Sequence, residues 1–307
     1  MPPEIANLRE KSVTLVHHAA HNDHHHPSGS LAALEHCLRA GADVVEIDVI
    51  PLADDSFALL HDHDLSAGTN GTGKASQMSR SQIQNLYYWV DNKTSHEKIG
   101  FLEEALELLG AYPHTRRLQL DFKPVAPLSQ SSLRKFLALI EPVIDRVQVT
   151  SYADWVLRAL VQFAPGLALG FDPLLYLDLV EDTPRPKDVP PFRLGAYGLM
   201  DDHPLSVYLW GSLGDYFAAR ASALLVQVPR GCQWFIRAAL LKMALDANFD
   251  WIEFLHQNGS TVDGWTINVN QAEHMDMARL LVAHGIDALT TDTPAKLAAQ
   301  LSTETNL

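Results

Sequence analysis

Short apolar segments alternate with amphipathic segments along most of the chain, and this alternation constrains the fold more than any other feature of the sequence. An apolar run of about four to eight residues is typical of a buried strand, whereas apolar residues spaced three and four apart indicate a helix. Leu31, Leu34 and Leu38 have the helical spacing, Ser30 precedes them as a candidate cap, and Gly41 ends the segment. Repeated strand-helix units favour a parallel sheet, because parallel neighbours need a long crossover connection.

The number of predicted strands points to a closed barrel. Their starts fall near residues 13, 44, 118, 146, 167, 223, 264 and 287. Eight parallel strands alternating with helices form a (β/α)8 TIM barrel of about 250 residues. We therefore expect an α/β protein with a single barrel domain over residues 1–307, a small insertion after the second strand at about 50–117, and a proline-rich excursion before the sixth strand at about 172–222.

Two carboxylates share one side of the second predicted strand. Side chains alternate along a strand, so Glu46 and Asp48 point one way while Val45, Ile47 and Val49 point the other way. Like charges about 6 to 7 Å apart repel each other, so such a pair is typical of a bound cation or of an exposed surface. The apolar neighbours argue against simple exposure.

Other polar side chains are expected to join this pair. Turn residues at 53–56 and an apolar run at 57–60 predict a hairpin that returns His61 to the side of the two carboxylates. Barrel active sites lie at the carboxyl ends of the strands. Six side chains are therefore predicted to converge on the barrel mouth: Glu46, Asp48, Asp121, His17, His61 and Lys123.

The chemistry of these six side chains suits phosphate ester cleavage. Carboxylate oxygens fit a hard divalent ion such as Mg²⁺, Ca²⁺ or Mn²⁺ better than a structural zinc. Histidines that titrate near neutral pH give and take protons, while one metal ion and a lysine bear the charge that develops on a phosphoryl group. The set predicts a metal-dependent enzyme that acts on a phosphodiester.

Composition excludes several other classes of function. A formal net charge of −14 disfavours nucleic-acid backbones and anionic membranes, which attract clustered Lys and Arg. The sequence has no run of about 18 apolar residues, and the first fifteen residues lack an apolar signal core. Two cysteines, Cys37 and Cys232, predict neither a disulfide framework nor a zinc motif. We expect a cytoplasmic protein with a small-molecule substrate and no integral membrane association, and the oligomeric state is left open.

In their order along the chain, these residues also resemble a known family, the glycerophosphodiester phosphodiesterases, whose barrels share a superfamily with phosphatidylinositol-specific phospholipases C. His17-His18-Ala19 stands where that family has His-Arg-Gly, and His61-Asp62 stands where it has His-Asp. The remaining matches are Glu46-Ile47-Asp48-Val49 for Glu-Leu-Asp-Val, Asp121-Phe122-Lys123 for Glu-Ile-Lys, Ser151-Tyr152 for Ser-Phe, Trp265-Thr266-Ile267-Asn268 for Trp-Thr-Val-Asn, and Thr291-Asp292-Thr293-Pro294 for Thr-Asp-x-Pro. Each motif is weak alone, but their joint order is specific.

The resemblance implies a role for each matched side chain. His17 and His61 would be the general acid/base pair. Glu46, Asp48 and Asp121 would be the metal ligands. The substrate would meet His18, Lys123 and Trp265. Attack at phosphorus would come from a neighbouring hydroxyl, giving a cyclic phosphate, or from water, and the sequence leaves open which histidine is the acid.

The chain departs from the family pattern on the substrate side. His18 replaces the phosphate-contacting arginine, Ala19 replaces the glycine, and Pro27-Ser28-Gly29-Ser30 replaces Pro-Glu-Asn-Thr after a longer loop that includes the histidine tract at 21–26. Histidine cannot reproduce the bidentate fork of arginine, so a different substrate or phosphate pose is expected. A sugar phosphodiester of the agrocinopine type is one candidate. The alternatives are a sphingomyelinase D-like or lysophospholipase D-like enzyme, and a non-catalytic barrel that binds sugar phosphates.

Overall fold

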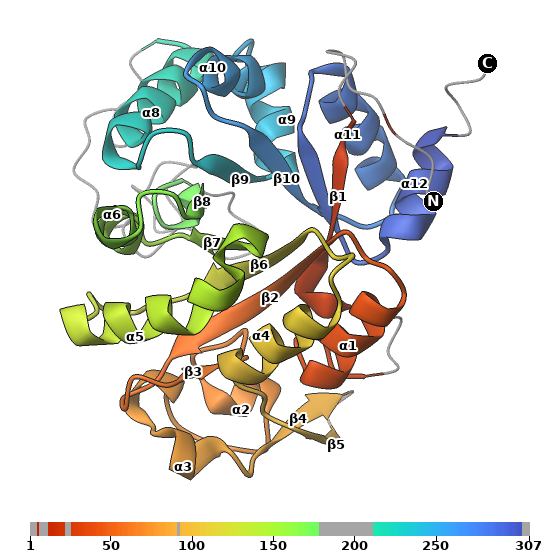
Figure 1. The fold of residues 1–307 in the computed structure, drawn as a ribbon. Coiled ribbons are helices and arrows are strands. Elements are labelled where there is room, and N and C mark those ends of the chain that lie inside the picture. Colours follow the sequence, from red (N-terminus) through yellow and green to blue (C-terminus); the bar gives the residue numbers. More distant parts are fainter. Residues whose placement is uncertain (1–4, 6–11, 22–25, 91–92, 178–210, 303–307) are drawn as a thin grey trace.

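Eight parallel strands close into a barrel, as predicted. The computed structural model describes residues 5, 12–21, 26–90, 93–177 and 211–302 (Figure 1). The ring closes because the first strand pairs with both the second and the last. Around the ring the strands are β1 (Thr14–His17), β2 (Val44–Pro51), β6 (Arg117–Phe122), β7 (Val147–Ser151), β8 (Ala168–Phe171), β9 (Gln233–Arg237), β10 (Val262–Ile267) and β11 (Ala288–Thr291).

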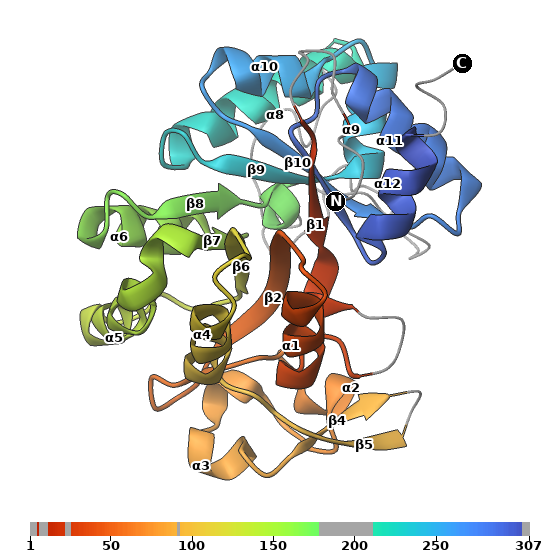
Figure 2. The same ribbon diagram turned by 45° about the vertical axis from the view of Figure 1, so that its right-hand side comes forward.

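Helices follow the strands and cover the outside of the barrel (Figures 1 and 2). Ser30 caps the first of them as predicted, since its hydroxyl accepts a hydrogen bond from the Ala33 N–H at 3.1 Å. The covering helices are α1 (Leu31–Arg39), α4 (Leu102–Ala111), α5 (Gln130–Ile140), α6 (Asp154–Phe163), α8 (Leu213–Gln227), α9 (Ala238–Asp246), α10 (Trp251–Gln257), α11 (Ala272–Ala283) and α12 (Pro294–Ser302). Their apolar faces and the outward strand residues form the main hydrophobic core.

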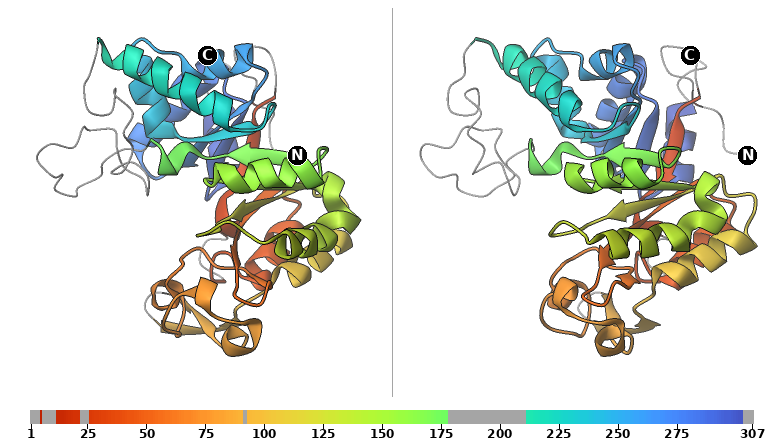
Figure 3. Two further views of the ribbon diagram at one scale, coloured as in Figure 1. Left: turned by 90° about the vertical axis from the view of Figure 1, so that its left-hand side faces the viewer. Right: turned by 60° about the vertical axis from the view of Figure 1, so that its left-hand side comes forward.

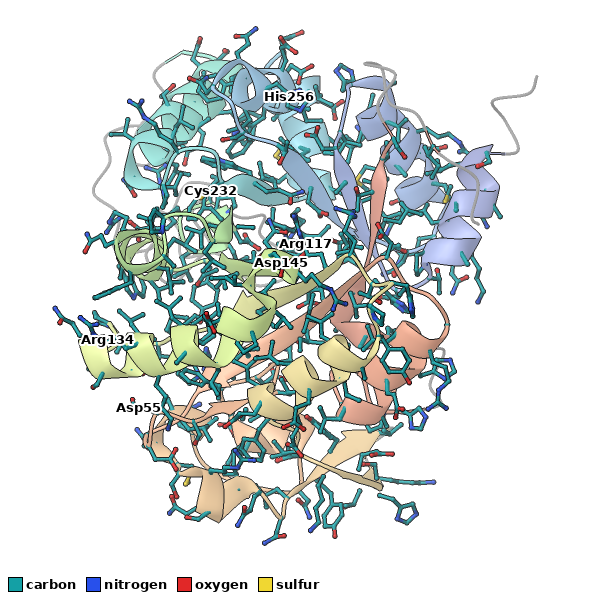
Figure 4. All side chains as sticks on the ribbon, viewed as in Figure 1. Asp55, Arg117, Arg134, Asp145, Cys232 and His256 are labelled. Atoms are coloured by element: carbon teal, nitrogen blue, oxygen red, sulfur yellow. The ribbon has the colours of Figure 1, made fainter. Side chains whose placement is uncertain are left out.

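The direction of the side chains follows from two sets of buried residues. Val45, Ile47 and Val49 belong to the main core outside the barrel. Val16 and Val44 instead line a small cavity that touches seven of the eight strands or the residues just before them, so these two valines point into the barrel. Arg117, near the centre of the view in Figure 4, lines the same cavity. Because side chains alternate, the residues two and four positions after Val44 also point inward.

An insertion after β2 forms a small unit at one end of the barrel (Figures 1 and 3). Its first strand, β3 (Phe57–Ala58), pairs antiparallel with β2, which confirms the predicted hairpin. The Tyr88 hydroxyl donates to the Leu59 carbonyl at 2.6 Å and fixes the insertion to the end of that hairpin. The other elements are α2 (Leu65–Gly68), α3 (Arg80–Ile83) and the two-stranded sheet of β4 (Tyr87–Val90) and β5 (Lys93–Lys98).

The predicted position of the sixth strand was wrong. Residues 223–228 lie at the end of α8 and just beyond it, whereas the strand is β9, which lies inside the helix predicted at 232–246. Alanine and leucine favour a helix here, and the buried residues Phe217, Arg220 and Leu224 recur at helical spacing. Val226, central to the supposed strand, is 86% exposed.

The proline-rich excursion at 172–222 is described only at its two ends. Pro173–Leu175 form a 3₁₀ turn, residues 213–222 belong to α8, and residues 178–210 lie outside the described part of the chain. The extent of one domain over residues 1–307 therefore stays a prediction. Among the described residues, no helix is long and apolar enough to cross a membrane.

The tight packing inside the barrel leaves no space for a side chain at Gly170, and this can be tested. A methyl group there would lie 2.5 Å from the Phe235 ring and 2.8 Å from Thr150 Oγ1. We expect Gly170→Ala to lower the free energy of unfolding by about 1–3 kcal/mol in urea denaturation, because the packed interior has no room for the extra carbon. The matched control is Gly110→Ala on α4, where a methyl group meets nothing within 4 Å and should stabilise the helix. Equal stability of Gly170→Ala and wild type would contradict this packing.

Candidate active site

Three carboxylates meet inside the carboxyl end of the barrel, as predicted. Glu46 and Asp48 come from β2 and are 4% and 5% exposed, and Asp121 lies beside Asp48 on the neighbouring strand β6. One oxygen from each of the three lies within 4.8 Å of the others. This spacing allows all three to bind a single hard cation, for which oxygen ligands are preferred.

Lys123 joins two of these carboxylates. Its Nζ lies 2.9 Å from Asp48 Oδ1 and 3.0 Å from Asp121 Oδ2. Burial works against the charge of Lys123, but the two aspartates outweigh it and hold the pKa of the ammonium above its ordinary value. Burial also opposes ionisation of Asp48, yet Lys123 and His61 lower its pKa, whereas burial raises the pKa of Asp121. Lys123 therefore compensates the aspartates and leaves Glu46 to another partner.

Glu46 is the least compensated acid of the group. Burial and the neighbouring charge of Asp48 raise its pKa to about 8. The backbone N–H of Ala19 donates to its Oε2. A divalent cation in place of the Glu46 proton would relieve both causes of the shift, so the donor set fits the metal that the sequence predicts.

The turn after β1 brings a histidine to the same place. Val16 points into the barrel, so alternation turns His17 outward with Leu15, and the 3₁₀ turn that starts at residue 18 turns His18 inward. His18 Nδ1 lies 2.7 Å from Asp292 Oδ1. Burial opposes the charge of His18, but Asp292 and Glu46 raise its pKa to about 9. The structure thus brings His18 into the cleft beside the carboxylates, and the charge of His17 also helps to lower the pKa of Asp292.

The backbone of this turn has an unusual conformation for its residues. Ala19 and Ala20 have φ angles of 49° and 51°, in the left-handed region that glycine adopts most readily. The turn is held by the Ala19 N–H bond to Glu46 and by the Gly29 N–H, which donates to the Ala19 carbonyl at 2.6 Å. Glu46 therefore fixes the turn that orients His18.

His61 stands at the edge of the site, just after the hairpin. Its Nδ1 lies 3.2 Å from Asp62 Oδ1, and its side chain is 64% exposed. It is close enough to Asp48 and Asp121 to lower the pKa of both. Nearby, His63 Nε2 lies 3.0 Å from the Tyr152 hydroxyl, whose pKa burial raises to about 12.

A cleft of about 430 Å³ opens between the barrel and the insertion. Its lining includes His18, Asp48, His61 and Asp292 on the barrel side. The opposite walls are the loop around 26–29 and the insertion residues 64–69 and 88–90. His21 and His26 of the predicted histidine loop also line it, and residues 22–25 lie outside the described part.

Trp265, the last of the predicted site residues, lies beside Arg237, which the sequence analysis did not identify. Trp265 lies on β10, and the guanidinium carbon of Arg237 lies 5.0 Å from its ring centroid. Arg237 ends β9, the strand whose position was predicted wrongly, so its place at the barrel mouth could not be seen. The only sequence signal was a basic residue that closes the apolar run Trp234-Phe235-Ile236.

Comparisons with known proteins place the chain in a family. The model of the glycerophosphoryl diester phosphodiesterase family matches residues 17–165, which hold the three carboxylates, His18, His61 and Lys123. The chain belongs to this family. As a member of this family, the protein is a phosphoric diester hydrolase. A glycerophosphodiester phosphodiesterase of Caldanaerobacter subterraneus is 25% identical over 88% of this chain and 90% of its own length.

A further relative agrees with this assignment. The human glycerophosphodiester phosphodiesterase 1 is 26% identical over 52% of this chain and 48% of its own length. Two solved structures share the fold. A phosphodiesterase from Oleispira antarctica, in complex with the product sn-glycerol-3-phosphate, has a TM-score of 0.64 at 19% identity and covers 94% of this chain and 96% of its own. A putative glycerophosphoryl diester phosphodiesterase from Silicibacter pomeroyi has a TM-score of 0.66 at 18% identity, over 99% and 95%.

The ion pair of His18 can be tested by titration. In Asp292→Asn we expect the pKa of His18 to fall from about 9 toward its ordinary value, because the variant loses the carboxylate that accepts from Nδ1. NMR of the imidazole nitrogens measures this pKa. Asp276→Asn, on the surface of α11, is the matched control and should leave it unchanged. An unchanged pKa in Asp292→Asn would rule out the pair.

The same shift sets the sign of a small pH effect on stability. The folded-state pKa of His18 lies above its ordinary 6.5, so the ion pair stabilises the fold fully below pH 6.5 and fades as the pH rises through about 9. The His18 side chain is 37% exposed. Because water screens the ion pair, its contribution to the free energy of unfolding is less than about 1 kcal/mol.

Proposed function

We propose that this protein is a metal-dependent phosphodiesterase that hydrolyses a glycerophosphodiester or a sugar phosphodiester. The observation that carries the proposal is the meeting of Glu46, Asp48 and Asp121 within 4.8 Å at the mouth of the barrel. His18 and His61 line the cleft that opens beside these acids. A cation site next to two groups that can exchange protons is the minimum that this reaction needs.

In this proposal one divalent cation, Mg²⁺, Ca²⁺ or Mn²⁺, is held by Glu46, Asp48 and Asp121. When bound, the cation supplies positive charge for a phosphoryl oxygen and for the attacking group. Lys123, which bridges Asp48 and Asp121, favours the ionised form of these two ligands and holds them in place, and its predicted role at the phosphate is part of this proposal. The substrate is bound in the cleft between barrel and insertion.

Proton transfer is assigned to His18 and His61. The pKa of His18 is raised to about 9, so this histidine is protonated at neutral pH and suits the general acid. Asp292 engages its Nδ1, which leaves Nε2 as the atom that protonates the leaving alcohol. His61 then serves as the general base for the nucleophile. We assign this role to His18 because it lines the cleft, while the acid/base role that the resemblance implies for His17 stays a prediction.

The nucleophile is water or a hydroxyl next to the ester. The Oleispira antarctica phosphodiesterase of the same fold binds its product sn-glycerol-3-phosphate, which forms by direct attack of water or by later opening of a cyclic phosphate. Attack by a neighbouring hydroxyl would release a cyclic phosphate instead, and ³¹P NMR of the products distinguishes the two.

Substitution of His17 and of His18 tests which of these two neighbours takes part in proton transfer. We expect His18→Gln and His61→Gln each to lower kcat for a glycerophosphodiester by roughly 10²-fold or more, because each loses a proton-transfer group. His17→Gln should lose far less. Steady-state kinetics with glycerophosphocholine and with bis(p-nitrophenyl)phosphate measures these rates. A large loss in His17→Gln together with a small loss in His18→Gln would restore the assignment to His17.

Removal of divalent cations tests the other half of the site. After treatment with EDTA we expect turnover to fall to the background rate, and Mg²⁺, Ca²⁺ or Mn²⁺ to restore it to different degrees. Glu46→Gln should respond weakly to added metal, since one ligand charge is missing. Full activity in EDTA would contradict metal dependence. Phosphate binding without any turnover would favour a non-catalytic barrel, and cleavage of lysolipids alone would favour a phospholipase D-like enzyme.

A further inference from the structure

We propose that Arg237, stacked on Trp265, is a phosphate-binding residue that clamps the substrate from the side of the barrel opposite the carboxylates. This inference rests on the proposed function for the identity of the bound group. It assigns a new residue, because neither the motifs of the sequence nor the matched residues 17–165 include Arg237.

The register of β9 directs Arg237 into the barrel mouth. Gln233, at the start of this strand, lines the small interior cavity. Phe235 is next on the same face, and its ring meets the interior side of Gly170 and thus points inward. Arg237 is the third residue of this series, so its side chain leaves the carboxyl end of β9 on the inward side.

The position of β9 in the ring places Arg237 across from the carboxylates. From β2 to β9 there are four steps around the ring in either direction, through β6, β7 and β8 or through β1, β11 and β10. A strand four places away in a ring of eight is diametrically opposite. The end of β9, where Arg237 stands, therefore lies opposite the carboxylates of β2 and β6 across the barrel mouth.

Trp265 holds the guanidinium in a fixed plane. Trp265 and Arg237 are register partners on β10 and β9, and the guanidinium carbon lies 5.0 Å from the ring centroid. A guanidinium that stacks on an aromatic face keeps its N–H donors at its edge, where they can bind two oxygens of a phosphate. The buried Trp265 Nε1–H has no acceptor among the described residues.

The positive groups beside the carboxylates are already paired, so a phosphate would gain from the additional charge of the Arg237 guanidinium. Lys123 is already engaged by Asp48 and Asp121, and His18 is engaged by Asp292. A divalent cation would balance the carboxylate charge that Lys123 leaves, but it adds no net positive charge for the phosphate. The turn after β1 has His18 and Ala19, neither of which provides a bidentate guanidinium.

Binding of inorganic phosphate and of sn-glycerol-3-phosphate to the Mg²⁺-saturated protein tests the proposal by calorimetry, without turnover. We expect Arg237→Met to raise Kd for both ligands by about tenfold or more, because it loses charge-assisted hydrogen bonds. Arg237→Lys should lie between Arg237→Met and wild type, since it keeps the charge but not the planar fork. Arg230→Met, at the exposed turn before the same strand, is the matched control and should bind like wild type.

Three results would overturn the inference. They are wild-type affinity in Arg237→Met, an equal loss in Arg230→Met, and no phosphate binding by the wild-type protein at saturating Mg²⁺. Thermal unfolding of each variant checks its fold, and Arg237→Lys decides the matter if Arg237→Met does not fold. The proposed function fails separately, when the wild-type protein binds phosphate through Arg237 but cleaves no phosphodiester.

Discussion

The burial of three like charges at the mouth of the barrel is the constraint on which the site depends. Glu46 and Asp48 point inward because the valines and isoleucine between and beside them are needed in the core outside the barrel. Asp121 is beside Asp48 on the next strand. Buried carboxylates without partners cost several kcal/mol each. Lys123 compensates the two aspartates, and Glu46 keeps a raised pKa that a bound cation would relieve.

The first strand shows how this constraint extends to the proton-transfer groups. Glu46 accepts from the Ala19 N–H, and this bond helps to hold a turn whose alanines have positive φ angles. The turn places His18 beside Asp292, and the acids behind it raise the pKa of the imidazole. A metal ligand, a strained turn and a protonated histidine are thus connected, so changes at Glu46 should affect acid catalysis as well as cation binding.

Much of this arrangement could be predicted from the sequence because it depends on local periodicity. Strand alternation put Glu46 and Asp48 on one face, and turn residues predicted the hairpin before His61. The cap of the first helix at Ser30 was also predicted correctly. The sixth strand was placed wrongly because the short apolar run at 223–228 resembles a buried strand. Its alanine and leucine residues favour a helix, and the burial of Phe217, Arg220 and Leu224 at helical spacing shows that it ends one. Arg237 was missed with this strand. A choice between His17 and His18 requires the register of β1, since a shift of one residue reverses the face.

Glu46, Asp48 and Asp121 are proposed to form one cation site at the barrel mouth. Diffraction from crystals soaked in Mn²⁺, recorded near the manganese absorption edge, tests it most directly. We predict one strong anomalous peak roughly 2.0–2.6 Å from a carboxylate oxygen of each of the three residues. Absence of a peak there at saturating Mn²⁺, with Lys123 still bridging Asp48 and Asp121, would contradict the account.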